Sequence, residues 1–247
     1  MDWITWKLYA VYHLYCKFRI NRLVPGILGV IDAYQKQTKS TGTKYPTLYK
    51  AVKTILKKRP QWILESGTGT STLVLAETVL HLKKHNPDYQ GQIVSMESIE
   101  EWHTMAQKLL PQKYRDIVDI RLGKRQTYEY SMFRGYIHSN IPDEPFDFVF
   151  LDGPSYEDDK GSSTCMDAVK VRIDSDKQMI SCVVDTRVSS VFMMQQILGL
   201  ETIRYYPIFR TCSFDMPKIQ TCPNLNSRSF LYSLGGKLRV KTSAFLT

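Results

Sequence analysis

The chain lacks the cysteine pattern of a metal-binding or disulfide-rich domain. Its five cysteines are odd in number and include no Cys-x-x-Cys pair: Cys16, Cys165, Cys182, Cys212 and Cys222. Cys165 lies in a helix-like pattern and Cys182 in a strand-like pattern, so both are expected to be buried thiols. Cys212 and Cys222 could pair or share a metal, but no histidine lies near them. A reduced state is therefore the simpler expectation.

A long uninterrupted apolar run is also missing. Residues 1–35 carry aromatic side chains at three-residue spacing, but Lys7, His13 and Lys17 interrupt the apolar stretch. Such a segment is poorly suited to span a membrane. The start of the chain has neither a basic n-region nor a small-residue cleavage site, so no cleavable signal is expected. Together with reduced cysteines, this predicts a cytoplasmic location.

Acidic residues are outnumbered, with 24 Asp and Glu against 33 Lys and Arg, which gives a net charge of +9. This basic balance favours an anionic partner, such as nucleic acid, a membrane surface or an anionic sugar. Ordinary surface lysines explain it equally well. The chain has 247 residues and is 43% hydrophobic, which suits one compact domain with a sizeable core.

The most informative stretch is residues 62–75, which read Trp-Ile-Leu-Glu-Ser-Gly-Thr-Gly-Thr-Ser-Thr-Leu-Val-Leu. An apolar run ends near Glu65, a glycine-rich turn follows, and a helical pattern begins, so strand, tight loop and helix are predicted. Gly67 and Gly69 permit positive φ and a close approach of a ligand to the backbone. The free amides at the start of the helix favour a polar ligand. Three hydroxyl residues are each able to cap this helix: Thr70, Ser71 and Thr72.

Two phosphate-binding interpretations of this loop fail. A P-loop needs a lysine after the last glycine, and none is present. A dinucleotide fingerprint needs a third Gly or Ala where Thr72 stands, and Glu65 would lie beside the pyrophosphate. The pattern Glu-x-Gly-x-Gly-x-Ser resembles motif I of class I S-adenosylmethionine-dependent methyltransferases. The alternative is a glycine turn that only packs a helix on a strand.

Carboxylates end three further predicted strands. These strands are residues 91–97, 146–152 and 179–185, which end at Glu97, Asp152 and Asp185. In a parallel sheet all four strand-terminal acids gather at the carboxyl edge, where the ligands of open α/β sheets bind. This repetition extends the methyltransferase resemblance over about residues 45–200.

The resemblance implies roles for these residues. Glu65 would face the amino-acid end of the cofactor, and a bulky side chain at Gly67 would fill the space of the ligand. Glu97 would accept hydrogen bonds from the ribose, unless it only caps the following helix, residues 99–110. Asp152 would lie beside the methyl donor, unless it is a turn-forming Asp before Gly-Pro. The implied cofactor-binding set is Glu65, Ser66, Gly67, Thr68, Gly69, Ser71, Thr72, Glu97, Ser98 and Asp152.

Methyl transfer to oxygen or nitrogen needs alignment of the reactants and often a base. The candidate catalytic residues are Asp152 and Asp185. In metal-dependent catechol-type O-methyltransferases, one of the two corresponding strands ends in Asp and the other in Asp-Asn. Asp152 and Asp185 match these strand ends, but Thr186 stands where the Asn would be. The divalent metal site would therefore lack one ligand.

The predicted function is S-adenosylmethionine-dependent methylation, with transfer to an oxygen of a small-molecule or sugar-type acceptor. Two other classes stay open. One is an aminopropyl transferase that uses decarboxylated adenosylmethionine. The other is a non-catalytic methyltransferase-like binding module associated with nucleic acid or a membrane surface.

The predicted fold class is α/β: a doubly wound Rossmann-like sheet, mostly parallel with an antiparallel C-terminal edge and helices on both faces. Residues 1–44 are expected to form a helical cap and a mobile loop, and residues 45–247 the methyltransferase-like domain. The alternative for the N-terminal helix is to lie peripherally on an anionic membrane surface.

The finer expectations concern loops and the C-terminal strands. Residues 123–127 are predicted to cover the adenine, and residues 134–145 to form an inserted surface loop that includes His138. Two terminal strands are predicted, residues 201–209 and 228–234, with a loop at residues 210–227 between them.

Overall fold

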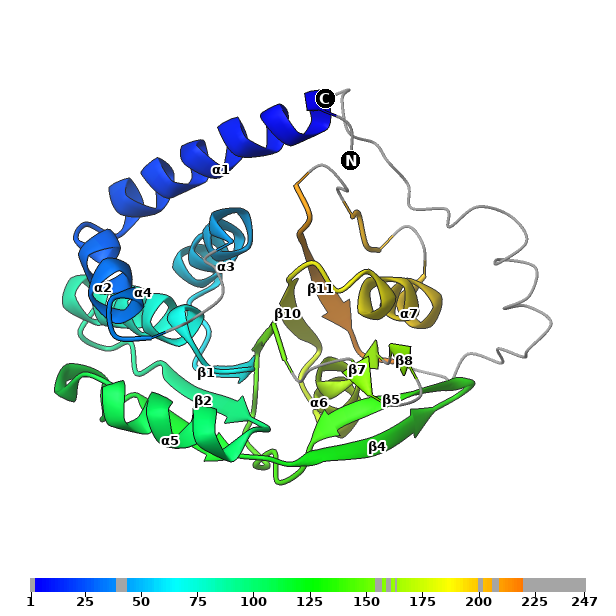
Figure 1. Cartoon of the computed structure of the whole chain (residues 1–247). Coiled ribbons are helices and arrows are strands. Elements are labelled where there is room, and N and C mark those ends of the chain that lie inside the picture. Colours follow the sequence, from blue (N-terminus) through cyan, green and yellow to red (C-terminus); the bar gives the residue numbers. More distant parts are fainter. Residues whose placement is uncertain are drawn as a thin grey trace.

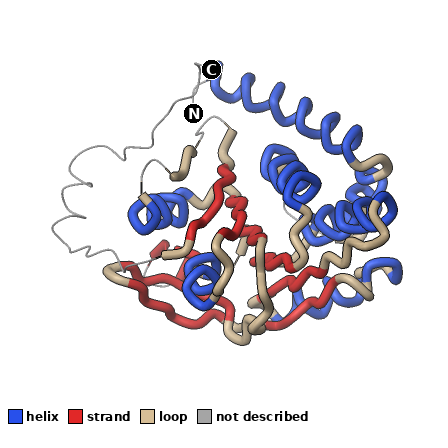
Figure 2. The backbone as a smooth tube through the Cα atoms, turned by 180° about the vertical axis from the view of Figure 1, so that it is seen from behind, coloured by secondary structure: helices blue, strands red, loops and turns tan. Residues whose placement is uncertain are grey.

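The computed structural model describes residues 3–38, 44–153, 157–158, 161–162, 164–199, 202–205 and 209–219. Within these residues a six-stranded sheet stands between two layers of helices (Figures 1 and 2). Its strand order is β11-β10-β6-β1-β2-β3. The strands are β1 (Trp62–Ser66), β2 (Gln92–Glu97), β3 (Val118–Leu122), β6 (Phe148–Leu151), β10 (Met179–Val184) and β11 (Cys212–Pro217).

The sheet is parallel except at one edge, where β11 pairs antiparallel with β10. Strand order reverses between β1 and β6, so the loops after these two strands leave the sheet side by side. Ligands of doubly wound folds bind at such a reversal. The predicted fold class is confirmed.

One face of the sheet is covered by α3 (Tyr45–Lys58), α4 (Thr70–His85) and α5 (Glu100–Leu109). Successive strand residues point to opposite faces; Ile63 packs in this layer and Leu64 in the other. The start of α3 is favoured by Pro46, whose ring fixes a helical φ and whose missing N–H has no partner to lose. A short 3-10 turn, Gln112–Tyr114, connects α5 to β3.

The opposite face is covered by α6 (Asp167–Asp174), α7 (Val188–Leu198) and a hairpin of β4 (Arg125–Tyr130) and β5 (Phe133–His138). Short β9 (Thr164–Cys165) pairs with β5, and β7 (Glu157–Asp158) pairs with β8 (Gly161–Ser162). Cys165 thus lies in a strand just before α6, where a helix-like pattern was expected. The hairpin corrects two expectations, because β4 begins within the predicted adenine loop, residues 123–127, and β5 takes up the first five residues of the predicted surface loop, residues 134–145. Alternate residues of β5, Phe133, Gly135 and Ile137, are buried, which is the period of a half-buried strand.

The C-terminal strand prediction was wrong in position. Residues 202–205 form a turn and an irregular segment, and the strand at the edge is β11, inside the predicted loop of residues 210–227. Its buried residues alternate as Cys212, Phe214 and Met216. Cysteine and methionine are weak strand signals, which explains the error. The predicted strand at residues 228–234, and Cys222, lie outside the described residues.

The N-terminal helices α1 (Trp3–Leu23) and α2 (Ile27–Gln35) form an outer layer over α3 and α4 (Figure 1). Cys16 and Ile20 of α1 and Ile31 of α2 belong to the same buried cluster as Ile63 of the sheet. The cap therefore shares its core with the domain beneath it. No helix in the described part of the chain is long and apolar enough to cross a membrane.

The four described cysteines are free and buried: Cys16, Cys165, Cys182 and Cys212. Burial raises the pKa of the Cys16 thiol to about 11 and that of Cys212 to about 12. It raises the pKa of Cys165 and Cys182 as well. These thiols are protonated near neutral pH, so they pack as small apolar side chains.

Candidate functional site

The glycine loop after β1 is shaped by two glycines with positive φ, Gly67 at 95° and Gly69 at 156°. The Gly67 amide donates to the carbonyl of Met96, 2.8 Å away, which ties the loop to β2. A Cβ on Gly67 would lie 3.0 Å from the Cα of Gly153, the residue after Asp152 in the neighbouring loop. A side chain at Gly67 would therefore strike Gly153. That a bulky one would also fill the space of a ligand stays a prediction.

Glu65 lies beneath the loop and is fully buried. Its Oε2 accepts hydrogen bonds from the hydroxyls of Thr72 and Ser95, each at 2.6 Å. The Thr72 oxygen in turn accepts the Gly69 amide at 3.0 Å, which caps α4. Burial raises the pKa of Glu65 to about 7, against the effect of the hydroxyls around it. Glu65 thus supports the loop from below through Oε2, while its Oε1 is buried without a hydrogen-bond partner among the described residues. That Glu65 faces the amino-acid end of a cofactor stays a prediction.

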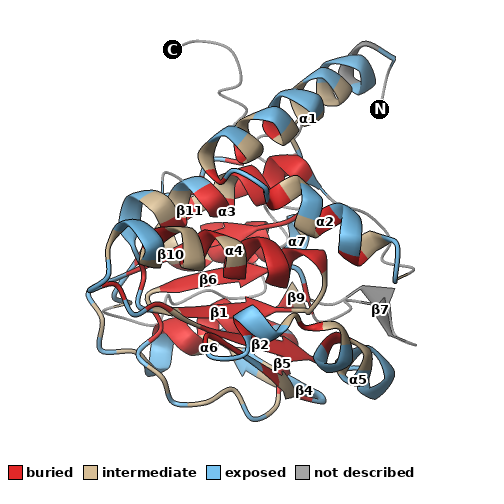
Figure 3. Ribbon diagram, turned by 90° about the vertical axis from the view of Figure 1, so that its left-hand side faces the viewer, coloured by how far each residue is buried: buried red, intermediate tan, exposed pale blue. Residues whose placement is uncertain are grey.

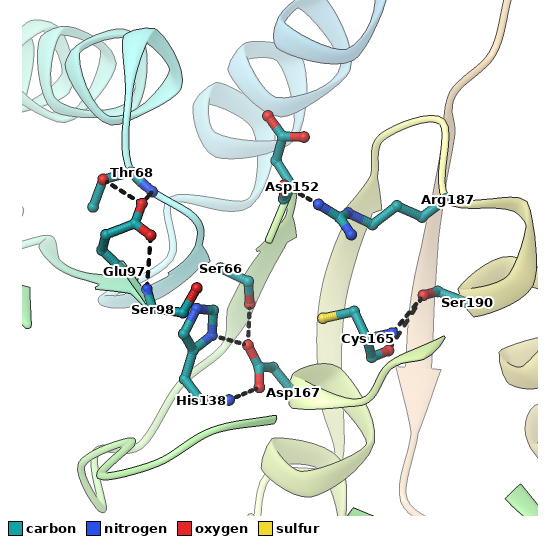
Figure 4. A network of polar contacts seen from close by, with 10 residues as sticks. All are labelled: Ser66, Thr68, Glu97, Ser98, His138, Asp152, Cys165, Asp167, Arg187 and Ser190. Atoms are coloured by element: carbon teal, nitrogen blue, oxygen red, sulfur yellow. Dashed lines mark hydrogen bonds and ion pairs between the residues drawn. The ribbon is translucent and has the colours of Figure 1, made fainter. Parts of the chain in front are cut away.

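Glu97, at the end of β2, is held against the same loop. Its Oε2 accepts the Thr68 hydroxyl at 2.9 Å, and its Oε1 accepts the amides of Ser98 and Ile99 at 2.7 and 2.9 Å (Figure 4). The last two bonds hold the amides of the two residues that lead into α5 (Glu100–Leu109), so this oxygen fixes the entry to the helix. The other oxygen faces the loop. Oε2 also accepts the Thr68 amide at 3.4 Å, a long and therefore weak hydrogen bond that a better-placed donor can replace.

Asp152 lies on the other side of Ser66 from Glu97 (Figure 4). Its amide donates to the Ser66 carbonyl at 2.9 Å, and its own carbonyl accepts a hydrogen bond from Arg187. The Asp152 side chain keeps an exposed surface, yet the protein packs closely enough around the carboxyl group to remove much of its water. This loss of water, followed by the negative charge of Asp185, raises the pKa of Asp152 to about 7.

Asp185 is the buried partner of Asp152, with 2% of its surface exposed. It forms an ion pair with Lys44, and its Oδ1 accepts the Thr47 hydroxyl at 3.1 Å. Thr186 donates to Oδ2 at 3.2 Å. Burial alone would raise the pKa of Asp185, but the charge and hydrogen bond of Lys44 outweigh it and lower the pKa, with help from the Thr186 backbone and the Asp152 side chain. The pair therefore has one carboxylate that stays ionised and one that titrates near neutral pH.

The position of Lys44 is relevant to whether Asp185 could bind a divalent metal ion. Its ammonium group contacts both Asp185 and, at 3.1 Å, the hydroxyl of Thr186, the residue that replaces the expected Asn. A divalent cation on Asp185 would have to displace this ammonium. Within the described ranges, no three His, Cys, Asp or Glu side chains are grouped so as to hold a metal ion.

One network at the site was missed by the sequence. Asp167, at the start of α6, accepts the Ser66 hydroxyl at 2.6 Å on Oδ2 and the His138 amide at 2.9 Å on Oδ1. The Nδ1 of His138 lies 2.7 Å from the same Oδ2 (Figure 4). Both side chains are fully buried. Asp167 thus links the end of β1, the end of β5 and α6. An Asp in the first turn of a helix carries no signal for such a contact.

The predicted cofactor-binding residues divide into two groups. One group lies at the carboxyl edge of the sheet: Gly67, Thr68 and Gly69 form the loop, and Glu97 lies against it. The others lie beneath or beside it, with Ser66, Ser71 and Thr72 buried. The Ser98 amide donates to Glu97. Asp152 and its partner Asp185 lie on the other side of the loop from Glu97. The arrangement can accept hydrogen bonds from a hydroxylated ligand at Glu97 and remove a proton at Asp152.

No protein-family model matches the chain, and no curated protein matches its sequence. Solved structures similar to it include the O-methyltransferase TomG from Streptomyces achromogenes in complex with SAM. The alignment has 12% identity and a TM-score of 0.48 and covers 80% of this chain and 90% of TomG. A methyltransferase from Geobacter sulfurreducens aligns with 9% identity and a TM-score of 0.47, over 77% and 88%. NSun6 from Pyrococcus horikoshii with SFG aligns with 8% identity and a TM-score of 0.37, over 71% and 52%.

Proposed function

We propose that this chain is an S-adenosylmethionine-dependent methyltransferase that acts on a hydroxyl group of a small-molecule or sugar-type acceptor. The observation that carries the proposal is the placement of two acidic groups about one glycine loop. Thr68 holds the Glu97 carboxylate against the loop on one side, and Asp152 stands on the other. The glycine loop and Asp152 follow β1 and β6, the two strands between which the strand order reverses, and Glu97 ends the neighbouring strand β2. Such a reversal is the expected ligand site of this fold.

The donors and acceptors present fit this cofactor. Glu97 offers an acceptor oxygen to the ribose hydroxyls, and Asp152 offers negative charge beside a sulfonium. Gly69 leaves open space, because a Cβ there would meet no atom within 4 Å. The cofactor supplies an electrophilic methyl group when it is bound.

Asp152 is the proposed base. An acid–base group works best when its pKa lies near the working pH, and the pKa of Asp152 is raised to about 7. Asp185 keeps its charge through Lys44 and so favours the protonated form of Asp152 once a proton has been taken up. The acceptor hydroxyl would give its proton to Asp152 as its oxygen bonds to the transferred methyl carbon, whose bond to the sulfonium sulfur would break to leave a neutral thioether.

Lys44 takes the place that a divalent cation would occupy in a catechol-type site. Its ammonium group neutralises Asp185 and lowers the pKa of Asp152 as well. The proposed mechanism therefore uses a fixed lysine charge, and a chelator is expected to leave the rate unchanged. We also propose that the protein works in the cytoplasm, since its described thiols are free.

A screen with isotopically labelled S-adenosylmethionine tests the function. Catechols, sugars, nucleic acid and protein extracts serve as acceptors, and the D152N variant is the control for background transfer. Label in a hydroxylated small molecule or sugar, lost in D152N, supports the proposal. Label only in nucleic acid would replace the acceptor class. Cofactor binding without any transfer would favour the non-catalytic binding module, and transfer from decarboxylated adenosylmethionine would favour the aminopropyl transferase.

A further inference from the structure

Helix α1 has two apolar faces, and one of them packs into the core of the described part of the chain. Cys16 and Ile20 pack inward against the core. The other side carries large apolar side chains that are 46–68% exposed: Trp3, Trp6, Leu8, Val11, Leu14, Tyr15 and Phe18. Scattered exposed apolar residues are normal, but a contiguous set on one element marks an interaction surface.

The spacing of these residues makes them one surface. Val11, Leu14 and Phe18 follow one another at three and four residues, so they lie along one side of the helix. Tyr15 lies at the edge of this side, where its ring also meets Tyr49 of α3. Figure 3 shows α1 as the outermost layer, with exposed residues along the side that faces away from α3. We call this surface the outer face of α1. A cap and an interaction surface are therefore two sides of the same helix, where the sequence had presented them as alternatives.

The charge of α1 has one sign only. Its basic residues are Lys7, Lys17, Arg19 and Arg22, and it contains no Asp or Glu. Lys7 and Arg22 are exposed, and Arg19 is half-buried. Basic residues beside Trp, Phe and Leu are the composition of helices that lie in the interface of an anionic bilayer.

Lysines of α3 extend the basic surface beyond α1. The rings of Tyr15 and Tyr49 meet edge to face at 6.2 Å between centroids. Arg19 stands over the Tyr15 ring at 5.8 Å, and Lys53 over the Tyr49 ring at 5.5 Å. Further along α3, the exposed Lys57 lines a pocket of about 240 Å³ with Lys53. An apolar strip thus lies next to a basic strip on adjoining helices.

We propose that the outer face of α1, together with the lysines of α3, binds the surface of an anionic membrane. The apolar side chains would enter the interface, with Trp3 and Trp6 at the level of the headgroups, where indole rings are favoured. The basic side chains would meet anionic headgroups, each adding a modest attraction that salt weakens. The charge decides against a second copy of this chain as the partner, because two such faces would bring like charges together. This proposal does not depend on the methyltransferase assignment.

Flotation of the full chain with vesicles tests it. The vesicles contain phosphatidylcholine alone or phosphatidylcholine mixed with phosphatidylglycerol. Wild-type protein should float with the anionic vesicles, less at high salt, and much less with phosphatidylcholine alone. The V11S/L14S/F18S variant should lose at least about tenfold in binding, the effect of removing several partly inserted side chains. These residues are 65–67% exposed, so the variant should fold normally.

The matched control is I99S/I173S/M179S, which removes three exposed apolar side chains from other elements and should float like the wild type. K53E/K57E should weaken flotation and reduce its dependence on salt. The proposal is overturned if the wild type does not float, or if V11S/L14S/F18S floats like the wild type. It is also overturned if light scattering shows a wild-type dimer that this variant turns into a monomer.

Discussion

Gly67 and Gly153 touch through their backbones, so that neither position has room for a side chain. A Cβ on Gly153 would lie 2.7 Å from both the Cα and the nitrogen of Gly67. The contact joins the loops after β1 and β6 at the centre of the sheet edge. It fixes the distance between the glycine loop and Asp152, the next residue back along the chain. The geometry of the site therefore depends on the absence of two side chains.

Replacing Gly153 by alanine should cost about 2 kcal/mol of stability or more, because backbone rather than a flexible side chain must move. G67A should cost at least as much, since its φ of 95° adds strain. Thermal unfolding measures both. G29A, in α2 with open space around it, is the control and should be neutral or slightly stabilising. A G153A protein as stable as the wild type would refute the tight contact.

Asp152 is expected to act in the chemical step. D152N should lower turnover by about 10²- to 10⁴-fold, the usual contribution of a general base, while cofactor affinity changes little. Only the ionised form of Asp152 can take a proton. Since its pKa is raised to about 7, wild-type kcat/KM should fall as the pH drops below 7. A rate that is flat between pH 5 and 8, with unchanged turnover in D152N, would reduce Asp152 to a turn residue.

Lys44 is expected to set the working pH. Its charge lowers the pKa of both Asp152 and Asp185, so K44M should move the acidic limb of the rate profile to higher pH. Activity near pH 7 should fall by roughly tenfold or more. K57M, which removes an exposed lysine from the last turn of α3, is the control and should leave the profile in place. An unchanged limb in K44M would separate Lys44 from the acid pair.

Glu65 makes a prediction about stability. Its pKa rises from an ordinary 4.5 to about 7 in the folded protein, so the folded state holds a proton that the unfolded state loses first. The stabilisation is complete below pH 4.5 and is lost as the pH rises through 7, by roughly 3 kcal/mol at most. E65Q cannot titrate there, so its melting temperature should gain on that of the wild type between pH 5 and 8. If the melting temperatures of the wild type and E65Q change equally with pH over this range, the raised pKa of Glu65 is contradicted.

The main features of the fold could be predicted because they depend on local patterns. Apolar runs that end in a carboxylate gave four strands of the sheet, and the glycine loop gave the start of α4. The hairpin β4–β5 could not be recognised, since Arg125–Tyr130 is polar along most of its length and lies largely at the surface. The C-terminal edge strand was predicted at the wrong residues because β11 contains cysteine and methionine, which are weak strand signals.

The site was predictable only in outline. Strand-terminal acids could be expected at one edge, but the direction of each side chain depends on contacts distant in sequence. Glu65 turns beneath the loop because Ser95, 30 residues later, offers a hydroxyl there. The Lys44–Asp185 pair spans 141 residues. Asp167 and His138 meet because β5 packs beside α6 in the fold, and no sequence motif predicts such a contact.

Calorimetric titration with S-adenosylmethionine tests the central claim most directly. The wild type should bind one equivalent. E97A should bind on the order of 10- to 100-fold more weakly, the effect of losing hydrogen bonds to a charged group, about 1–3 kcal/mol. E101A, an exposed carboxylate in the first turn of α5, is the control and should bind like the wild type. No heat and no thermal stabilisation of a folded wild-type protein, or equal affinity in E97A, would contradict a cofactor site between Glu97 and Asp152.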